Sequence, residues 1–444
     1  MINRLRRANA EQRKLLFSLG TNFATRIPGS IGVLFFLPLL RSGLGTEDYA
    51  KLLAASALGI AAAFLSGGFN VVGRRLVGEA YSAGDRRGEA AAFASLSVAN
   101  GVSLLFALVV IIIYCVAVGA GAAYLIAAAL PVIAAFFNTF DNVRSAYNEH
   151  YVTATLLIIL QVIAYSFGFL EPYTRQNLVV SGFVLNSPYL FASFFTLVLL
   201  LRKRSYLIGG NWNCTWRIIR EGTVYALADG LLTTTLSLAV VWLETVASAQ
   251  TSAWFATLVR LFQIFLVPVI LLLIPLSSYI RVVWNTSGPV KQQAFASITL
   301  MMGLGYGVLV GIALLFVSHL YIGGVLHLSA PKNLLHVLPC FVLFAAIVAY
   351  RSYSSIAYLV FDNPSHLSWW TTLAVITAVI IGTASSLEID ALGAINVYAF
   401  LAGLLMIGVL LWNVARFIRL SRSRALSEAI DAIKAPSFSI SKSG

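Results

Sequence analysis

Residues 91–118 read AAFASLSVANGVSLLFALVVIIIYCVAV, a stretch without a charged side chain. A helix rises 1.5 Å per residue, so about 20 apolar residues cross the ~30 Å hydrocarbon core of a membrane. The stretch therefore predicts a transmembrane helix. The whole chain is similar, because 59% of its 444 residues are hydrophobic and only 11% are charged. Soluble proteins carry about 25% charged residues, so the composition argues against a water-soluble enzyme, a nucleic-acid-binding domain and a disordered chain.

Apolar runs of this length recur along the sequence, about twelve in all. They lie at residues 15–40, 52–72, 91–118, 121–143, 151–170, 177–201, 222–246, 253–283, 294–321, 333–360, 367–387 and 390–415. The longest connection between them, around 202–221, leaves no room for a folded domain outside the membrane. The sequence therefore predicts an all-α, polytopic membrane protein with about twelve transmembrane helices.

The basic residues gather on one side of this predicted topology. The chain has 30 Lys and Arg residues, and the loops on the side away from the N-terminus hold only four of them, Arg41, Lys51, Arg175 and Lys332. Because cytoplasmic loops collect Lys and Arg, we expect both termini to face the cytoplasm. The net charge of +13 then reflects topology and attraction to anionic lipid, and no nucleic-acid partner is expected.

Polar stripes interrupt three of the predicted spans. An ionisable group within a span indicates the protein interior or a water-filled cavity. Arg26 in the first span and Arg260 in the eighth have polar neighbours one helical turn away, and Asp229 and Glu244 share one face of the seventh. The candidate cavity residues are Asn22, Thr25, Arg26, Asn70, Ser237, Thr257, Arg260 and Gln263.

Two interpretations of these charges remain open. Arg26 and Arg260 either form structural ion pairs with Asp229, Glu244 or Asp141, or they line a cationic cavity for an anionic ligand. The planar guanidinium suits phosphate, which it binds through two parallel hydrogen bonds. Asp229 and Glu244 are likewise either structural partners or sites that couple transport to a proton or cation.

Catalytic and metal-binding patterns are missing from the sequence. There is no G-x-S-x-G motif, no phosphate-loop lysine and no carboxylate pair in an extramembrane domain. The three cysteines, Cys115, Cys214 and Cys340, lie far apart without metal-ligand spacing. We therefore expect no enzyme activity, no catalytic residue, no metal site and no cofactor.

Several stretches resemble one known family. Residues 26–28 and 34–38, the loop Arg41-Ser-Gly-Leu-Gly-Thr-Glu-Asp-Tyr-Ala50 and residues 67–69 resemble the opening of Wzx-type polysaccharide flippases. These flippases belong to the superfamily of multidrug, oligosaccharidyl-lipid and polysaccharide exporters. In that family the first outer loop reads much like L-G-x-x-x-Y-G, and here Ala50 replaces the last glycine. Residues 253–261 are similar to the eighth helix of the family.

The resemblance implies an architecture and a place in the cell. It implies two six-helix bundles, here residues 1–201 and 222–415, which close alternately around a central cavity. A cytoplasmic linker over 202–221 would join them, and a basic cytoplasmic tail over 416–444 would follow. The implied location is the bacterial inner membrane, spanned many times.

The resemblance also implies a substrate, an undecaprenyl-diphosphate-linked oligosaccharide repeat unit for O-antigen (lipopolysaccharide) or exopolysaccharide biosynthesis. Arg26 and Arg260 match in helix number the cavity arginines with which related flippases hold the diphosphate. The other cavity residues would contact sugar hydroxyls, while the lipid tail stays in the bilayer. A polysaccharide polymerase and a chain-length regulator are possible partners.

Two alternative functions follow from the same sequence. The first is a multidrug or cation antiporter of the same superfamily, which charge does not exclude because two intramembrane arginines balance two carboxylates. The second, a membrane glycan polymerase, would need a long outer loop with acid and base residues, and the longest loop is predicted on the other side.

Overall fold

The computed structural model describes the backbone of residues 2–147, 149–266, 289–328, 338–360, 365–387 and 389–434. Within these ranges, the side chains of residues 2–19, 21–29, 150, 174, 229, 232, 289–300, 352–360, 365–368, 413, 416–418 and 420–434 lie outside the description. Helices make up nearly all of the described chain, which contains no strand.

The first group of helices comprises α1 (Ile2–Ala62), α2 (Phe64–Ala83), α3 (Arg86–Val118), α4 (Ala122–Ala146), α5 (His150–Leu170), α6 (Tyr173–Gln176) and α7 (Leu178–Lys203). α1 contains two helices that meet at Gly45, whose φ of 78° lies in the region that favours glycine. The chain then bends by 43° between α1 and α2. The second predicted span is therefore a broken helix that continues well beyond residue 72.

The second group begins with η1 (Ser205–Gly209), α8 (Thr215–Tyr225), the π-helical turn η2 (Ala226–Gly230) and α9 (Leu231–Val246). A helix over 249–266 follows. The described chain continues with α11 (Pro289–Val317), η3 (Ser318–Val325), α12 (Leu338–Val360), α13 (Ser365–Ser385) and α14 (Ala391–Lys434). The seventh predicted span is thus α8, η2 and α9, bent by 67°.

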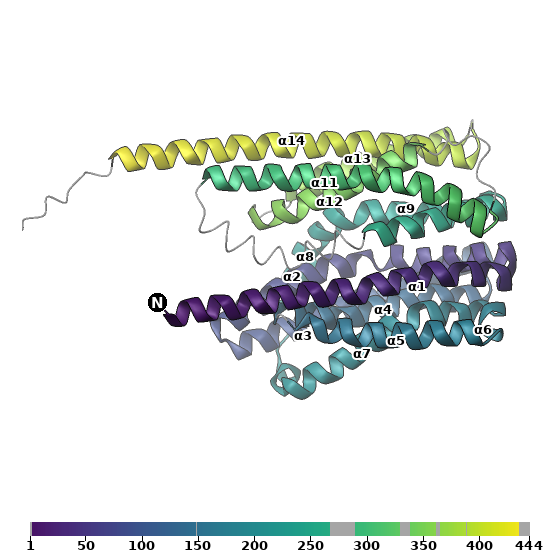
Figure 1. Ribbon diagram of the computed structural model, residues 1–444, viewed down its shortest axis with the longest axis horizontal. Helices are drawn as coiled ribbons and strands as arrows, with labels where there is room; N and C mark the ends of the chain where they lie inside the picture. The colour runs from purple at the N-terminus through teal and green to yellow at the C-terminus, as the bar shows by residue number, and fades with distance from the viewer. Residues whose placement is uncertain are drawn as a thin grey trace, which may run out of the picture.

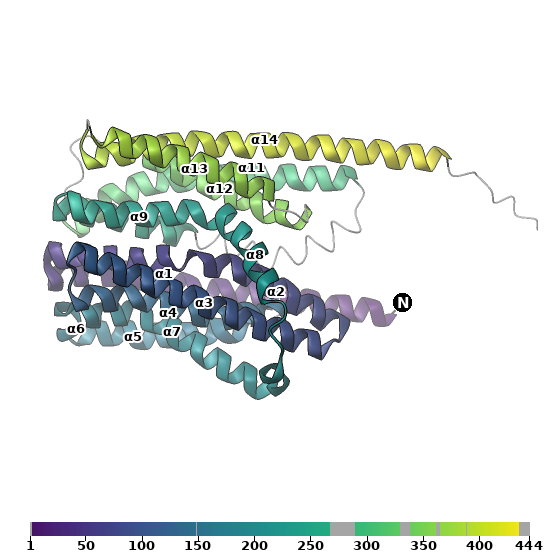
Figure 2. The same cartoon turned by 180° about the vertical axis from the view of Figure 1, so that it is seen from behind.

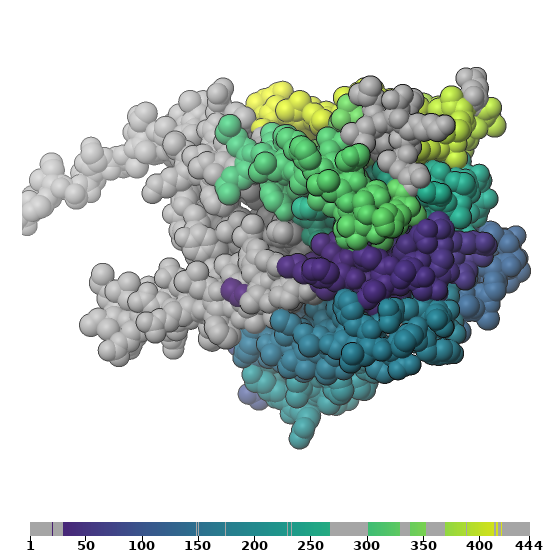
Figure 3. Space-filling view, turned by 45° about the vertical axis from the view of Figure 1, so that its right-hand side comes forward, coloured from purple at the N-terminus to yellow at the C-terminus, as the bar shows by residue number. Residues whose placement is uncertain are grey.

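The helices lie side by side in two groups, α1 to α7 and α9 to α14 (Figure 1). The start of α1 and the end of α14 lie at one end of the molecule, and α6 lies at the other (Figure 1). From behind, α8 crosses to meet α2 (Figure 2). α1 forms a band between the two groups (Figure 3) and packs against α4, α5 and α9.

The predicted spans agree with this architecture. Six described helices are each long and apolar enough to cross a membrane, and two bent helix pairs also meet this criterion. Their surface is apolar, because side chains such as Leu105, Val116 and Leu309 are exposed. Exposed apolar surface of this extent fits lipid rather than water. The all-α, multi-pass membrane fold expected from the sequence is therefore confirmed.

The connection after α7 is fastened to the first group of helices. Tyr206 donates a hydrogen bond of 2.7 Å to the carboxylate of Glu89, which also accepts one of 2.9 Å from Tyr147. Farther along, the backbone N–H of Cys214 donates to the hydroxyl of Ser95 at 3.1 Å. These contacts hold the expected linker against α3, so it is not a free tether.

A partly buried ion-pair network lies at the same end of α7. Glu149, between α4 and α5, accepts two hydrogen bonds of 3.1 Å from the guanidinium of Arg204 and one of 2.6 Å from Lys203. The guanidinium also lies 3.7 Å from the ring centroid of Tyr147. Burial raises the pKa of the Glu149 carboxyl, but these hydrogen bonds outweigh burial and hold the pKa below its ordinary value.

A carboxyl with a lowered folded-state pKa stabilises the protein above its unfolded pKa of about 4.3, and this contribution is lost as the pH falls through the folded pKa. We expect Glu149→Gln to lower the free energy of unfolding at pH 7 by roughly 1–3 kcal/mol. The difference from wild type should shrink as the pH falls below about 4. Thermal unfolding of the purified protein in detergent measures this.

The exposed carboxylate of Glu79, 3.8 Å from Arg75, provides the matched control. Glu79→Gln should change the free energy of unfolding by less than about 0.5 kcal/mol, both at pH 7 and below about pH 4. An equal loss of stability in both variants would show that the Glu149 network contributes nothing special.

Candidate functional site

A buried hydrogen bond joins α1 to the helix over 249–266. The phenol oxygen of Tyr49 lies 3.0 Å from the hydroxyl oxygen of Thr257, and both side chains are fully buried. The hydroxyl of Thr257 also donates a bond of 2.7 Å to the carbonyl of Ala253. Since Thr257 has one proton to give, Tyr49 is the donor in the bond between the helices. The bond ties one group of helices to the other.

Arg260 lies one helical turn after Thr257. Its side chain is half-buried, and its Nη1 donates a hydrogen bond of 3.2 Å to the amide oxygen of Gln263. Arg260 thus follows by three residues, on the same helix, the threonine that contacts Tyr49 of α1. Within the part of the chain that the structure describes, Arg260 forms no ion pair.

Tyr165 adds a second polar group without a partner. Its ring packs against Phe36 of α1 at 5.9 Å between centroids, and the position of a Cβ on Gly32 would meet the same ring. Its hydroxyl is buried and has no hydrogen-bond partner among the described residues. A buried hydroxyl without a partner costs about 1–3 kcal/mol, so a ligand that bonded to it would recover that cost. We name Tyr49, Tyr165, Thr257, Arg260 and Gln263 the Arg260 cluster.

Four of the predicted site residues have side chains outside the described part of the structure. Asn22, Thr25 and Arg26 lie in the first half of α1, and Asp229 lies in η2. The structure thus gives their place along the helices. Their roles remain predictions.

Two further predicted residues are engaged within their own surroundings. Asn70 of α2 accepts a hydrogen bond of 3.2 Å from the amide of Asn100, which in turn accepts one of 2.7 Å from Ser66. Ser237 is buried and donates to the carbonyl of Thr233 at 3.0 Å. These bonds engage the amide oxygen of Asn70 and the hydroxyl of Ser237, and a role in binding sugar stays a prediction.

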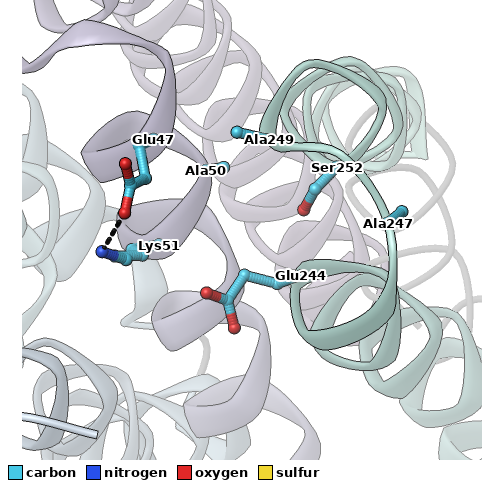
Figure 4. Close-up of a pocket in the computed structure, with 7 residues that line it drawn as sticks. All are labelled: Glu47, Ala50, Lys51, Glu244, Ala247, Ala249 and Ser252. Atoms are coloured by element: carbon cyan, nitrogen blue, oxygen red, sulfur yellow. Dashed lines mark hydrogen bonds and ion pairs between the residues drawn. The ribbon is translucent and has the colours of Figure 1, made fainter.

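Glu244, the last predicted residue, lines a separate cavity of about 220 Å³. Figure 4 shows its carboxylate opposite Glu47 and Lys51 of α1. Of the carboxylates predicted as partners of Arg260, neither Glu244 nor Asp141 forms a recorded ion pair with it within the described ranges.

Sequence reasoning missed Tyr49 and Tyr165. Tyr49 is the tyrosine of the L-G-x-x-x-Y pattern in the first outer loop, so the motif was a usable signal for it. Gly45 supplies the positive φ in the same motif, and Ala50, which stands where the family has its last glycine, is buried. Tyr165 had no comparable signal, because it is one of 18 tyrosines in the chain.

Comparison with known proteins gives the fold. The sequence matches no protein-family model and no curated protein. An inward-facing multidrug resistance MATE family transporter of the MOP superfamily has a TM-score of 0.60 and 13% identity, over 91% of this chain and 99% of that one. The MATE multidrug transporter DinF-BH in complex with R6G has a TM-score of 0.56 and 14% identity, over 88% of this chain and 94% of that one.

A third solved structure, the eukaryotic MATE transporter AtDTX14, has a TM-score of 0.54 and 14% identity, over 94% of this chain and 99% of that one. Identity this low establishes the fold alone. The chain is therefore a multi-pass membrane protein with a MATE-like transporter fold.

The two partners of the bond between Tyr49 and Thr257 should differ in their effect on stability. Tyr49→Phe leaves Thr257 bonded to Ala253, so we expect a loss of about 1 kcal/mol. Thr257→Val leaves the phenol buried without an acceptor, so we expect a larger loss of about 1–3 kcal/mol. The double variant should lose less than the sum. Thermal unfolding of the purified variants measures these values.

Thr383, exposed and bonded within its own helix to the carbonyl of Val379, serves as the control. The effects of Tyr49→Phe and Thr383→Val should add. Additivity between Tyr49→Phe and Thr257→Val as well would mean that the bond between the helices contributes nothing.

Proposed function

We propose that this protein moves a lipid-linked oligosaccharide, joined to its lipid by a diphosphate, across the membrane by alternating access. The fold supports transport, because its solved relatives are transporters. The observation that carries the choice of substrate is Arg260, a half-buried arginine in a predicted membrane span without an ion pair among the described residues.

The energetics of an intramembrane arginine favour an anionic substrate. An arginine near the centre of a membrane helix costs about 2.5–3.5 kcal/mol on insertion scales. Among the described residues, Arg260 donates one side-chain hydrogen bond, to the neutral amide oxygen of Gln263. A diphosphate would supply two or more charged acceptors in the geometry that the guanidinium fork matches. Arg26, on α1, would be the second cation at the diphosphate.

The other side chains of the Arg260 cluster could form hydrogen bonds with the sugar part of the proposed substrate. Gln263 and Thr257 carry side chains that bond to hydroxyl groups, and the free hydroxyl of Tyr165 does the same. Asn22, Thr25, Asn70 and Ser237 extend the proposed polar surface. The lipid tail would remain in the bilayer beside the exposed apolar helix faces while the head group crosses.

In this proposal the substrate is an undecaprenyl-diphosphate-linked repeat unit for O-antigen or exopolysaccharide, carried from the cytoplasmic to the outer leaflet of a bacterial inner membrane. A polysaccharide polymerase and a chain-length regulator would act on the product. Polymerisation, an ion gradient acting through Asp229 or Glu244, or both would drive the movement.

A multidrug or cation antiporter is the second candidate. The observation that favours it is the fold comparison, since one similar structure is a multidrug transporter in complex with R6G. The acidic cavity around Glu244 would also suit a cationic ligand. Arg260, which forms no ion pair within the described residues, argues against this candidate, because a cationic drug bound beside it would meet a like charge.

The substrate can be tested through Arg260. Arg260→Ala should reduce flipping of an undecaprenyl-diphosphate-linked oligosaccharide in proteoliposomes by at least tenfold, because the diphosphate loses its cation. Arg260→Lys should retain part of the activity, since it keeps the charge but loses the fork. The assay measures lipid accessible to a membrane-impermeant sugar-modifying enzyme.

Arg87→Ala, at an exposed arginine of α3, is the matched control and should flip substrate at the wild-type rate. Full activity in Arg260→Ala would overturn the proposed role of the arginine. In cells, deletion of the gene should leave lipid-linked repeat units on the cytoplasmic side. Normal surface polysaccharide together with increased drug sensitivity would favour the antiporter.

A further inference from the structure

Residues 202–220, which we name the connecting segment, run from the last turn of α7 into α8. Seen from behind, the segment crosses the direction of the long helices on its way to α2 (Figure 2). Tyr206 bonds to Glu89 of α3. The backbone N–H of Cys214 bonds to Ser95 of the same helix. Since α7 ends here, α3 begins here and both are candidate spans, the segment is a fixed strip along the boundary of the membrane.

Three large apolar side chains of the connecting segment are exposed. Ile208 is 70% exposed, Trp212 67% and Trp216 73%. The inward positions of the segment are already filled, because Leu207 and Ile218 are fully buried in the smaller apolar cluster. The exposed side chains are therefore directed away from the protein. Tryptophan is enriched where a membrane meets water, since its ring contacts apolar groups and its N–H contacts polar ones.

The charges of the connecting segment are all positive. Residues 202–220 include no acidic side chain and five basic ones, Arg202, Lys203, Arg204, Arg217 and Arg220. Three of the five have carboxylate partners, because Lys203 and Arg204 pair with Glu149, and Arg217 pairs with Glu221. Arg202 and Arg220 are exposed and form no ion pair among the described residues.

The spacing on α8 brings one of these charges beside a tryptophan. Trp216 and Arg220 are four residues apart on the helix, so they share a face. An exposed ring next to an exposed guanidinium matches the two layers of a lipid head, in which the phosphate lies above the first apolar groups. The two unpaired arginines add a preference for lipids with a net negative charge.

From these features we infer that the connecting segment binds anionic phospholipid. The rings of Trp212 and Trp216 lie in the headgroup layer, and Arg202 and Arg220 contact the lipid phosphates. The lipid then holds the segment from the outside, while the bonds to α3 hold it from the inside. The inference does not depend on which substrate the protein carries, because the segment contains no residue of the Arg260 cluster.

Quenching of tryptophan fluorescence by brominated lipid tests this surface on the purified full-length protein in detergent. Bromine quenches only the rings that it contacts, so the quenching lost in the double variant Trp212→Phe/Trp216→Phe reports these two rings. Half-maximal quenching of the two rings should need about fivefold less brominated phosphatidylglycerol than brominated phosphatidylcholine, because only the former carries a net charge.

The arginines of the segment are tested in the same assay. Arg202→Gln and Arg220→Gln should each raise the concentration of brominated phosphatidylglycerol for half-maximal quenching by about threefold to tenfold. Arg419→Gln, at an exposed arginine of α14, makes the same change in net charge and should leave that concentration unaltered. Arg260→Ala should also bind lipid as wild type does, which separates this surface from the proposed substrate site.

The substitutions remove exposed side chains, so thermal unfolding without added lipid should be the same for Arg202→Gln, Arg220→Gln and wild type. Equal quenching by the two brominated lipids would overturn the inference. So would an effect of Arg419→Gln as large as that of Arg220→Gln, because net charge alone would then account for binding. Failure of either lipid to quench the two rings would also contradict it and would indicate a surface for a soluble partner instead.

Discussion

Inside a bilayer no water completes the hydrogen bonds of a polar group, and the rest of the structure depends on this constraint. It drives the backbone into helices, and it pairs buried side chains such as Tyr49 with Thr257. Other buried polar groups lack a hydrogen-bond partner among the described residues, and three groups matter for the candidate sites: the Arg260 guanidinium, which has no ion pair there, and the hydroxyls of Tyr165 and of Ser252, which lines the cavity around Glu244. All three lie beside α1, the helix that borders both groups. Polar groups without a partner among the described residues therefore occur at the boundary between the two groups of helices, as well as elsewhere.

The spans could be predicted because their signal is local. A run of about 20 apolar residues identifies itself without knowledge of its neighbours. The breaks could not be predicted, since they depend on packing between distant segments. The bend after α1 is followed by Gly68, which abuts the backbone of Gly222 and Ala226 in α8 and η2. No sequence rule specifies that these helices approach so closely.

The candidate site likewise has a part that local sequence predicts and a part that depends on packing between distant segments. Thr257, Arg260 and Gln263 recur every three residues, so their common helix face follows from helical geometry, and the structure connects Arg260 with Gln263. Tyr165 could not be placed, because its position beside Phe36 arises from the packing of α5 against α1. The first outer loop shows an intermediate case, in which Gly45 and Tyr49 follow a family pattern whose physical reasons become clear only in three dimensions.

The connection between α7 and α8, which packs against α3, determines where the chain could be cut into two separately folding halves. The smaller of the two buried apolar clusters contains Phe69, Val72 and Leu96 of the first group, and Leu207, Ile218 and Tyr225 complete it. The chain must therefore run to about residue 225 before this core is full. A first half cut at residue 201 would expose the apolar surfaces of this cluster, whereas a cut after Tyr225 would leave the cluster intact.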